Sequence, residues 1–243
     1  MRRVDGRPFD ALRKVSITTG FQSFAEGSVL IELGRTRVCC SVTLLEKVPS
    51  FLKGQGSGWV TAEYSMLPRS TLTRSPRDST QGKISGRSHE IQRLIGRALR
   101  SVTDLTELGE HSLMVDCDVL QADGGTRTAS ITGAYVALYQ ALQTMANMGI
   151  ISSIPLNGAV AATSVGFVRG NMLLDLCYEE DFNAEVDFNV AMTDKGDFVE
   201  LQGTGESKPF SRENLDELLN LAKRGISELL SAQQEAINKL KFN

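Results

Sequence analysis

Residues 112–149 join an alternating segment to a helical segment through two adjacent glycines, and this constrains the fold more than any other part of the sequence. Apolar and polar side chains alternate over residues 112–120, which predicts a half-buried strand. Beyond Gly124 and Gly125, apolar side chains recur at steps of three and four residues until Gly149, which predicts a helix with one buried face. The strand therefore leads through two glycines to the beginning of a helix, where free backbone N–H groups and the helix dipole favour an anion.

The residues of this turn have the chemistry of a phosphate site. Gly125 lets the backbone approach a ligand closely, Thr126 adds a hydroxyl donor, and Arg127 adds a permanently charged guanidinium suited to phosphate oxygens. A motif this short is equally consistent with a tight turn whose arginine is solvated. The rest of the sequence decides between these two interpretations.

A second helix is predicted from about residue 85 or 88 to residue 102, because apolar side chains form a complete stripe along it. Arg87 falls in its first turn, where the helix dipole disfavours a cation by roughly 0.3–1 kcal/mol. A bound anion would remove this objection. Arg87 is therefore a second candidate for contact with the same phosphate.

Charge is distributed unevenly along the chain. Residues 69–100 contain eight Lys or Arg and two acidic residues, whereas residues 172–200 contain nine acidic residues and one lysine. Two solvated faces of opposite sign would explain this, but so would a polyanionic substrate held beside a metal or a general acid. Residues 68–78 are basic and follow no helical or strand period, so we expect a solvated connection that can reach a nucleic-acid backbone.

Five carboxylates lie close together between residues 179 and 187. An acidic surface loop is one interpretation, and a cation that relieves their mutual repulsion is the other. Mg²⁺ fits the second interpretation because it takes one or two carboxylates together with waters and substrate phosphates. Asp181 and Asp187 would then bind one ion together, or divide into a metal ligand and a general acid.

The remaining pattern predicts an α+β fold. Strands are expected at residues 15–19, 28–33, 37–45, 59–67, 158–168, 172–178, 186–192 and 198–202. The last helix is expected to begin near Ser211, with a polar tail from about Ser231 that frays. This order predicts one domain, residues 1–243, built as a duplicated β-then-α unit whose halves span about 1–150 and 151–243.

Several other chemistries and locations are not supported. No run approaches the roughly 18 apolar residues of a membrane span, and the N-terminus carries charge without an apolar run, so we expect a cytoplasmic protein with no membrane partner. The four cysteines lack the CxxC spacing of a zinc site. His89 and His111 lack the context of a covalent nucleophile, and residues 203–208 lack the spacing of a phosphate-binding loop. The chemistry is therefore expected to come from bound species.

Eight ordered motifs resemble the ribonuclease PH family. They are RVDGR (3–7), TAEY (61–64), MLPR (66–69), GR (86–87), EIQRLIGR (90–97), QADGGTR (121–127), EVDFNV (185–190) and ELQGT (200–204). The resemblance extends from Arg3 to about Leu230 and implies a phosphorolytic 3′-to-5′ exoribonuclease that trims tRNA precursors. It also implies the ribonuclease PH-like fold, a duplicated α+β unit (ribosomal protein S5 domain 2-like), assembled as a homo-hexamer, a trimer of dimers.

The resemblance assigns roles to residues that match the family's motifs. The phosphate-binding positions are Arg87, Gly125, Thr126 and Arg127, and the acidic, metal-assisting positions are Asp181 and Asp187. A basic loop associated with tRNA contact corresponds to Arg69, Arg74 and Arg77, and Arg93 and Arg97 of the following helix are further RNA-binding candidates. One departure is Ser75–Pro76, where more polar or basic residues are expected.

Two other functions compete with this interpretation. An inactive RNA-binding ring subunit of exosome type would keep the fold and the basic surface but lack the phosphate and acidic residues. A hydrolytic nuclease would use water in place of phosphate and release monophosphates. This sequence contains both residue sets, so the sequence favours the phosphorolytic enzyme.

Overall fold

The computed structural model describes residues 3–77, 80 and 82–240, and within them a five-stranded sheet occupies the first half of the chain. Its strands are β1 (Val15–Thr19), β2 (Gly27–Leu33), β3 (Thr36–Leu45), β4 (Trp59–Met66) and β5 (Ser112–Gln121). They lie in the order β1-β2-β3-β5-β4, with β4 and β5 parallel and the other neighbours antiparallel. A short 3₁₀ helix, η1 (Ser50–Leu52), lies between β3 and β4.

A second, antiparallel sheet belongs to the second half and has the order β7-β6-β8-β9. Its strands are β6 (Val160–Val168), β7 (Asn171–Leu174), β8 (Val186–Thr193) and β9 (Phe198–Gly205). The strand predicted for residues 172–178 ends at Leu174, so the prediction was wrong for residues 175–178. Asp175 adopts a left-handed backbone conformation with φ of 55°, so the chain leaves the sheet there and forms the short helix α4 (Tyr178–Phe182).

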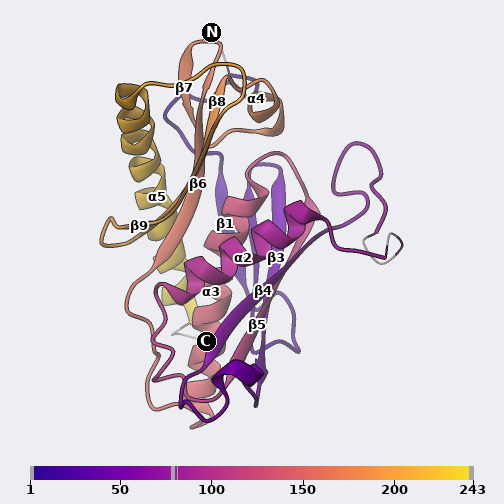
Figure 1. The fold of residues 1–243 in the computed structure, drawn as a ribbon, viewed down its shortest axis with the longest axis vertical. Helices are drawn as coiled ribbons and strands as arrows, with labels where there is room; N and C mark the ends of the chain where they lie inside the picture. The colour runs from indigo at the N-terminus through magenta and orange to yellow at the C-terminus, as the bar shows by residue number, and fades with distance from the viewer. Residues whose placement is uncertain (1–2, 78–79, 81, 241–243) are drawn as a thin grey trace.

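Three longer helices pack against these sheets. They are α2 (Gly86–Arg100), α3 (Thr126–Asn147) and α5 (Arg212–Leu240). Helix α2 packs on β4, α5 lies along β6, and α3 contacts β2 and β3 of the first sheet as well as β6 of the second (Figure 1). Helix α3 is therefore the layer that the two sheets share.

Helix α3 is buried on more than the one face that its apolar periodicity predicts. Small residues line its contact with the first sheet, and a Cβ added to Gly133 would lie 2.6 Å from Cγ2 of Ile31. A Cβ added to Gly27 of β2 would lie 2.1 Å from the carbonyl oxygen of Ala137. The missing side chains allow the helix and the sheet to approach closely, so α3 can be buried between two layers.

The expected fraying after Ser231 was also wrong. Helix α5 continues to Leu240, with Ala236 and Ile237 buried. The buried Gln233 donates from Nε2 to the carbonyl oxygens of Thr132 and Val160, at 2.9 and 3.0 Å. Although this tail is mostly polar, Gln233, Ala236 and Ile237 form a buried stripe, and Gln233 bonds α5 to α3 and β6.

The predicted α+β class is confirmed, with mixed sheets packed against helices. The division into two pseudo-repeated halves stays a prediction. The four cysteines are free and buried. In the part of the chain that the structure describes, no helix has both the length and the apolar character needed to cross a membrane.

Candidate active site

One cavity gathers the predicted phosphate and acidic residues. It has a volume of about 1130 Å³ and is lined from both halves of the chain, including Arg87, Gly125, Thr126, Arg127, Asp181 and Asp187. A more open groove of about 790 Å³ lies along α5 near Asp10 and Met172, and none of those six residues lines it. The chemistry of the lining, and not the shape of the hollow, therefore identifies the site.

The glycine turn at the start of α3 is shaped by close backbone contact. Gly124 and Gly125 have φ values of 73° and 65°. A Cβ at Gly124 would lie 2.5 Å from the carbonyl oxygen of Leu176 and 2.7 Å from the carbonyl carbon of Cys177. The turn thus packs directly on the backbone that leads into α4, which brings the start of α3 next to Asp181.

Tyr64 connects the two helix starts, and sequence reasoning did not identify it as part of the site. Its hydroxyl group lies 2.9 Å from the hydroxyl oxygen of Thr126. Burial raises the pKa of Tyr64, and the hydrogen bond with Thr126 and the charges of Arg87 and Arg127 oppose that rise. The sequence gives no signal for this role, because an aromatic residue in a strand is usually part of the core.

Arg87 lies in the first turn of α2, as predicted, after the N-cap Ser85, whose hydroxyl accepts from the backbone N–H of Ser88. Among the described residues of that first turn there is no acidic side chain to balance the arginine. One guanidinium nitrogen of Arg87 lies 3.7 Å from the sulfur of Met66, at the end of β4. The side chain is exposed, so its charge is available to a ligand in the cavity.

Arg127 is oriented by partners on other elements. Its Nη1 donates to the side-chain oxygen of Gln202 on β9 and lies 3.8 Å from Oε1 of Glu90 on α2. The amide nitrogen of Gln202 in turn donates to Glu90. This three-residue arrangement holds the guanidinium at the cavity wall, where a bidentate contact with phosphate oxygens is geometrically favoured.

The two aspartates influence each other and face the arginines. Burial raises the pKa of Asp187 to about 6, together with the charges of Asp181 and Glu206. Burial also raises the pKa of Asp181, although the charges of Arg127 and Arg87 oppose the rise. Asp181 reaches solvent on one side, and the protein atoms around its carboxylate in the cavity wall cause this desolvation. Glu206 lies in residues 203–208, which lack the spacing of a phosphate-binding loop. Its negative charge acts on both aspartates by raising their pKa values.

The residues present fit a magnesium ion. Within the described residues, no group of three or more His, Cys, Asp or Glu side chains could enclose a metal. Mg²⁺ needs fewer, since it accepts one or two carboxylates and completes its shell with waters and substrate phosphates. The mutual repulsion of Asp181 and Asp187 gives both carboxylates a reason to take up a cation.

A buried set of ion pairs holds the two parts of the cavity together, and sequence reasoning missed it. Arg13 donates to Asp175 from Nε at 2.9 Å and from Nη2 at 2.6 Å, and a further nitrogen of Arg13 contacts the carbonyl oxygen of Asp123 at 2.5 Å. Asp175 follows β7 and Asp123 belongs to the glycine turn. A single side chain from the N-terminal segment thus connects the turn to the second sheet.

Arg3 and Arg7 complete this set. Arg3 donates to both carboxylate oxygens of Glu180 on α4, at 2.8 and 2.7 Å, and both side chains are almost fully buried. Arg7 lies 3.1 Å from Asp175 and 3.4 Å from Glu180. Of the acidic run between residues 179 and 187, Glu180 is therefore a structural residue and not a surface charge.

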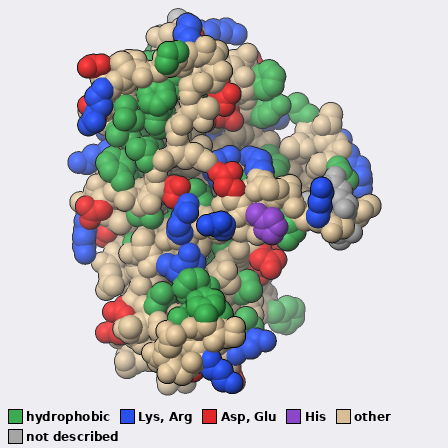
Figure 2. Space-filling model, viewed as in Figure 1, with side chains coloured by type: hydrophobic (Ala, Val, Ile, Leu, Met, Phe, Trp, Pro, Cys, Tyr) green, Lys and Arg blue, Asp and Glu red, His purple; other side chains and the backbone are tan. Residues whose placement is uncertain are grey.

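Of the five predicted RNA-binding arginines, Arg69 lines the cavity, and the other four are not among the residues that line it. Arg69, Arg74 and Arg77 are exposed on the connection between β4 and α2, which extends away from the body of the molecule, and Asp78 at its end lies outside the described residues (Figure 1). Lys and Arg side chains also gather over α2 (Figure 2). There Arg93 is exposed, and Arg97 forms an ion pair of 2.8 Å with Glu200 of β9.

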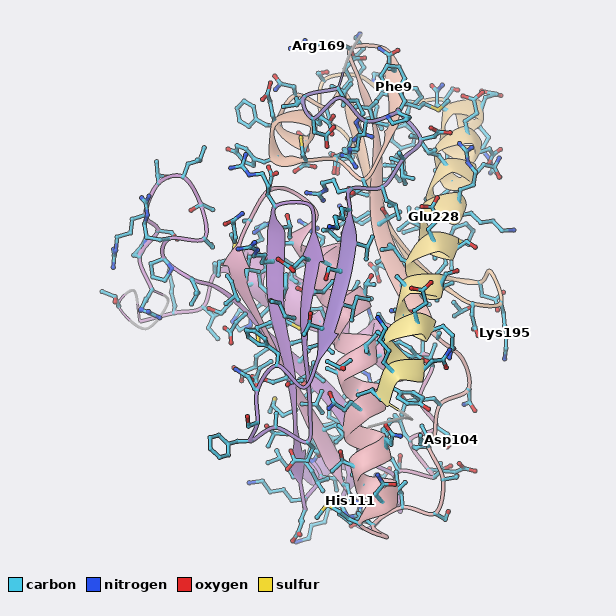
Figure 3. The ribbon with its side chains drawn as sticks, turned by 180° about the vertical axis from the view of Figure 1, so that it is seen from behind. Phe9, Asp104, His111, Arg169, Lys195 and Glu228 are labelled. Carbon is cyan, nitrogen blue, oxygen red and sulfur yellow. The ribbon has the colours of Figure 1, made fainter. Side chains whose placement is uncertain are left out.

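The histidines take no part in the cavity. Neither His89 nor His111 is among the described residues that line it. His111 lies at the end of the molecule opposite Arg169, which is in the turn between β6 and β7 (Figure 3).

We predict that Gly124→Ala lowers the free energy of unfolding by about 3 kcal/mol or more, because it combines left-handed strain with overlap against the backbone of residues 176–178. Gly170→Ala is the matched control, since Gly170 has a similar φ of 76° but nothing within 4 Å of an added Cβ. It should cost only about 1–2 kcal/mol. Denaturant unfolding measures both, and equal losses would contradict the close contact.

The raised pKa of Asp187 predicts a pH-dependent stability. Because the folded-state pKa of about 6 exceeds the unfolded value near 3.9, the folded chain binds more protons than the unfolded chain between these values. The contribution of Asp187 therefore makes the free energy of unfolding fall as pH rises through this window. In the presence of a chelator, Asp187→Asn should gain stability relative to the unmodified chain as pH increases from 4 to 7.

The control for this measurement is Glu235→Gln, which alters an exposed acid on α5. Its stability difference from the unmodified chain should vary less with pH than that of Asp187→Asn. Carboxyl NMR of Asp187 gives an independent value of the midpoint. A midpoint near 4 would contradict the burial and repulsion described above.

Comparison with known proteins adds the family. Residues 11–142 match the family model described as "3′ exoribonuclease family, domain 1", and residues 158–225 match the model described as "3′ exoribonuclease family, domain 2". A protein named ribonuclease PH from Dehalococcoides mccartyi is 63% identical over 234 residues, which covers 96% of this chain and 97% of that protein. Another ribonuclease PH, from Syntrophomonas wolfei, is 58% identical over 96% of this chain and 98% of its own length.

Solved structures show the same fold in more distant proteins. Rrp46 from rice (Oryza sativa) superposes with a TM-score of 0.78 at 19% identity, covering 97% of this chain and all of that chain. The Archaeoglobus fulgidus exosome, solved with RNA bound to its active site, gives 0.80 at 24% identity over 95% of this chain and 92% of that chain. The architecture, the two matched domains and the identities to relatives together show that this chain belongs to the ribonuclease PH group of the 3′ exoribonuclease family.

Proposed function

We propose that this chain is a phosphorolytic 3′-to-5′ exoribonuclease, a tRNA nucleotidyltransferase. An oxygen of orthophosphate forms a bond to the phosphorus of the terminal nucleotide, and the bond from that phosphorus to the 3′ oxygen of the preceding nucleotide breaks. The terminal nucleotide leaves as a nucleoside diphosphate, and the reverse reaction adds nucleotides. The single observation that carries the proposal is that Arg87 and Arg127, from separate helix starts, line one cavity with Asp181 and Asp187.

The binding of orthophosphate is assigned to the glycine turn and the two arginines. Arg87 and Arg127 neutralise its charge, and the backbone N–H of Gly125 and the hydroxyl of Thr126 add donors at the start of α3. Fixed donors of this kind orient the attacking oxygen and stabilise charge that develops in the transition state. The partners of Arg127 on α2 and β9 keep its guanidinium in place.

The acidic side of the cavity is assigned to the leaving group. Asp181 and Asp187 are the residues that would hold Mg²⁺, which when bound would supply charge stabilisation for the displaced 3′ oxygen. If the two residues divide these roles instead, Asp181 would hold the ion, and Asp187, with its pKa raised to about 6, would be protonated in a fraction of the molecules near neutral pH and would pass that proton to the 3′ oxygen. Burial is the largest cause of the raised pKa of Asp187, and charge repulsion from Asp181 adds to it.

The substrate is assigned as RNA, with the 3′ ends of tRNA precursors as the physiological class. This is supported by the exposed Arg69, Arg74 and Arg77 on the projecting connection, together with Arg93 and Arg97 on α2. A homo-hexamer of three dimers and a cytoplasmic location belong to the same proposal, because both go with the resemblance to the ribonuclease PH family. Orthophosphate is the co-substrate.

The products released from a short RNA test the reaction. We expect nucleoside diphosphates to appear only when phosphate is added, and chromatography of the products measures this. Monophosphates without added phosphate would mean a hydrolytic nuclease. RNA binding without any product in either condition would mean an inactive ring subunit.

Replacing Arg127 by alanine should lower the rate of phosphorolysis by a factor on the order of 10² to 10³, because a charge-assisted contact in the transition state is lost. Arg127→Lys keeps the charge but loses the forked geometry of the guanidinium. Its rate of phosphorolysis should lie between those of the unmodified chain and Arg127→Ala. Arg212→Ala, an exposed arginine on α5 paired with Asp216, is the control and should leave the rate unchanged. Full phosphate-dependent activity in Arg127→Ala would rule out the assignment.

A further inference from the structure

Helix α4 carries two exposed aromatic side chains beside Asp181. Tyr178 and Phe182 are 54% and 76% exposed, and their ring centroids lie 6.1 Å apart with 31° between the ring planes. Residues separated by four positions share one face of a helix, and Asp181 lies next to that face. Two large apolar rings left in solvent forgo the stabilisation that burial would give, so their position calls for a ligand or a partner.

The backbone under these rings is firmly held. Glu180, on the opposite side of α4, is buried and bonded to Arg3 by two hydrogen bonds. The same carboxylate accepts from the backbone N–H of Cys177 at 3.1 Å. The aromatic face of α4 is therefore pre-organised, which lowers the entropic cost of binding to it.

The two rings continue the wall of the active-site cavity outward. Tyr178 lines the cavity together with Asp181, whereas Phe182 lies next to Tyr178 and beyond the lining. A hydrophobic patch over α4 borders the hollow between the second sheet and the projecting connection (Figure 2). A chain that leaves the cavity on this side would pass Tyr178 first and Phe182 second.

The charges around the cavity indicate which part of a nucleic acid this wall suits. Glu179 and Asp181 on α4 repel phosphate groups, whereas Arg69, Arg87 and Arg127 attract them from other elements. Bases are uncharged and stack on aromatic rings in single-stranded RNA recognition. The arginine wall therefore suits the sugar-phosphate backbone, and the α4 wall suits the bases.

We propose that Tyr178 and Phe182 form a stacking platform for bases at the 3′ end of single-stranded RNA, an assignment that rests on the proposed function. The platform binds without regard to base identity, because every base presents a π face. It positions the RNA end and takes no part in bond breaking. A second copy of the chain does not suit this face, because Tyr178 lines the cavity that RNA must enter and a subunit covering it would close that entrance.

The test uses an oligoribonucleotide with 2-aminopurine near its 3′ end, whose fluorescence is quenched by stacking. Binding is measured without phosphate, so the readout does not depend on turnover. The unmodified chain should quench the probe, and the double variant Tyr178→Ala/Phe182→Ala should not, with RNA affinity about tenfold weaker. In phosphorolysis, KM for the oligoribonucleotide should rise by about the same factor while kcat and KM for phosphate stay unchanged.

Four further variants make the result specific. Tyr178→Phe and Phe182→Tyr keep an aromatic ring and should retain quenching, whereas Phe182→Leu keeps an apolar side chain and should weaken it. Phe24→Ala removes a fully exposed ring outside the cavity lining and should change nothing. Unchanged quenching in the double variant would overturn the platform. If sedimentation showed that the double variant no longer assembles while its RNA affinity is unchanged, the rings would belong to a subunit contact, and the platform would also be overturned. A chain that quenches the probe but releases no diphosphate would retain the platform and refute phosphorolysis.

Discussion

The ion pair between Arg13 and Asp175 is the interaction on which the site depends. Burial alone would raise the pKa of Asp175, but the charges of Arg13 and Arg7 and the hydrogen bonds from Arg13 hold it below its usual value. The side chains of the pair are only 4% and 2% exposed. Removing one partner from such a pair leaves an uncompensated buried charge and costs about 3–5 kcal/mol. The pair therefore fixes the point where the N-terminal segment, the glycine turn and the second sheet meet.

The same contact that closes the fold also assembles the site. Arg13 contacts the backbone of Asp123 while it binds Asp175, so the start of α3 and the approach to α4 cannot separate. Gly124 completes this junction because only a residue without a Cβ fits against the backbone of residues 176–178. Asp181 on α4 is consequently held close to Arg127. The charge of the arginine opposes the rise that burial causes in the pKa of Asp181. Stability and chemistry share these residues, and neither can change independently of the other.

The sequence predicted the parts of the site whose chemistry is local. Gly125 and Arg127 are neighbours in a strand-to-helix turn, and both glycine geometry and helix polarity can be inferred from a few residues. The Arg13–Asp175 pair joins positions 162 residues apart, so no periodicity or spacing reports it. The burial of α3 on several sides was also missed, because glycine and alanine in its contact with the first sheet give no apolar stripe. The prediction for the C-terminal tail failed for a related reason, since the buried amide Gln233 counts as polar in the sequence.

The cavity separates charges in a way that follows the course of the proposed reaction. Arg87 and Arg127 stand at two helix starts whose described first turns contain no acidic side chain, and Glu90, further along α2, lies 3.8 Å from Arg127. Asp181 and Asp187 stand on α4 and β8, and both keep raised pKa values even though Arg127 opposes the rise at each of them. An anion is therefore stabilised on one side, and a proton or a cation on the other. A phosphodiester lying between the two sides would have its attacking phosphate and its departing oxygen each placed against the charge that favours it.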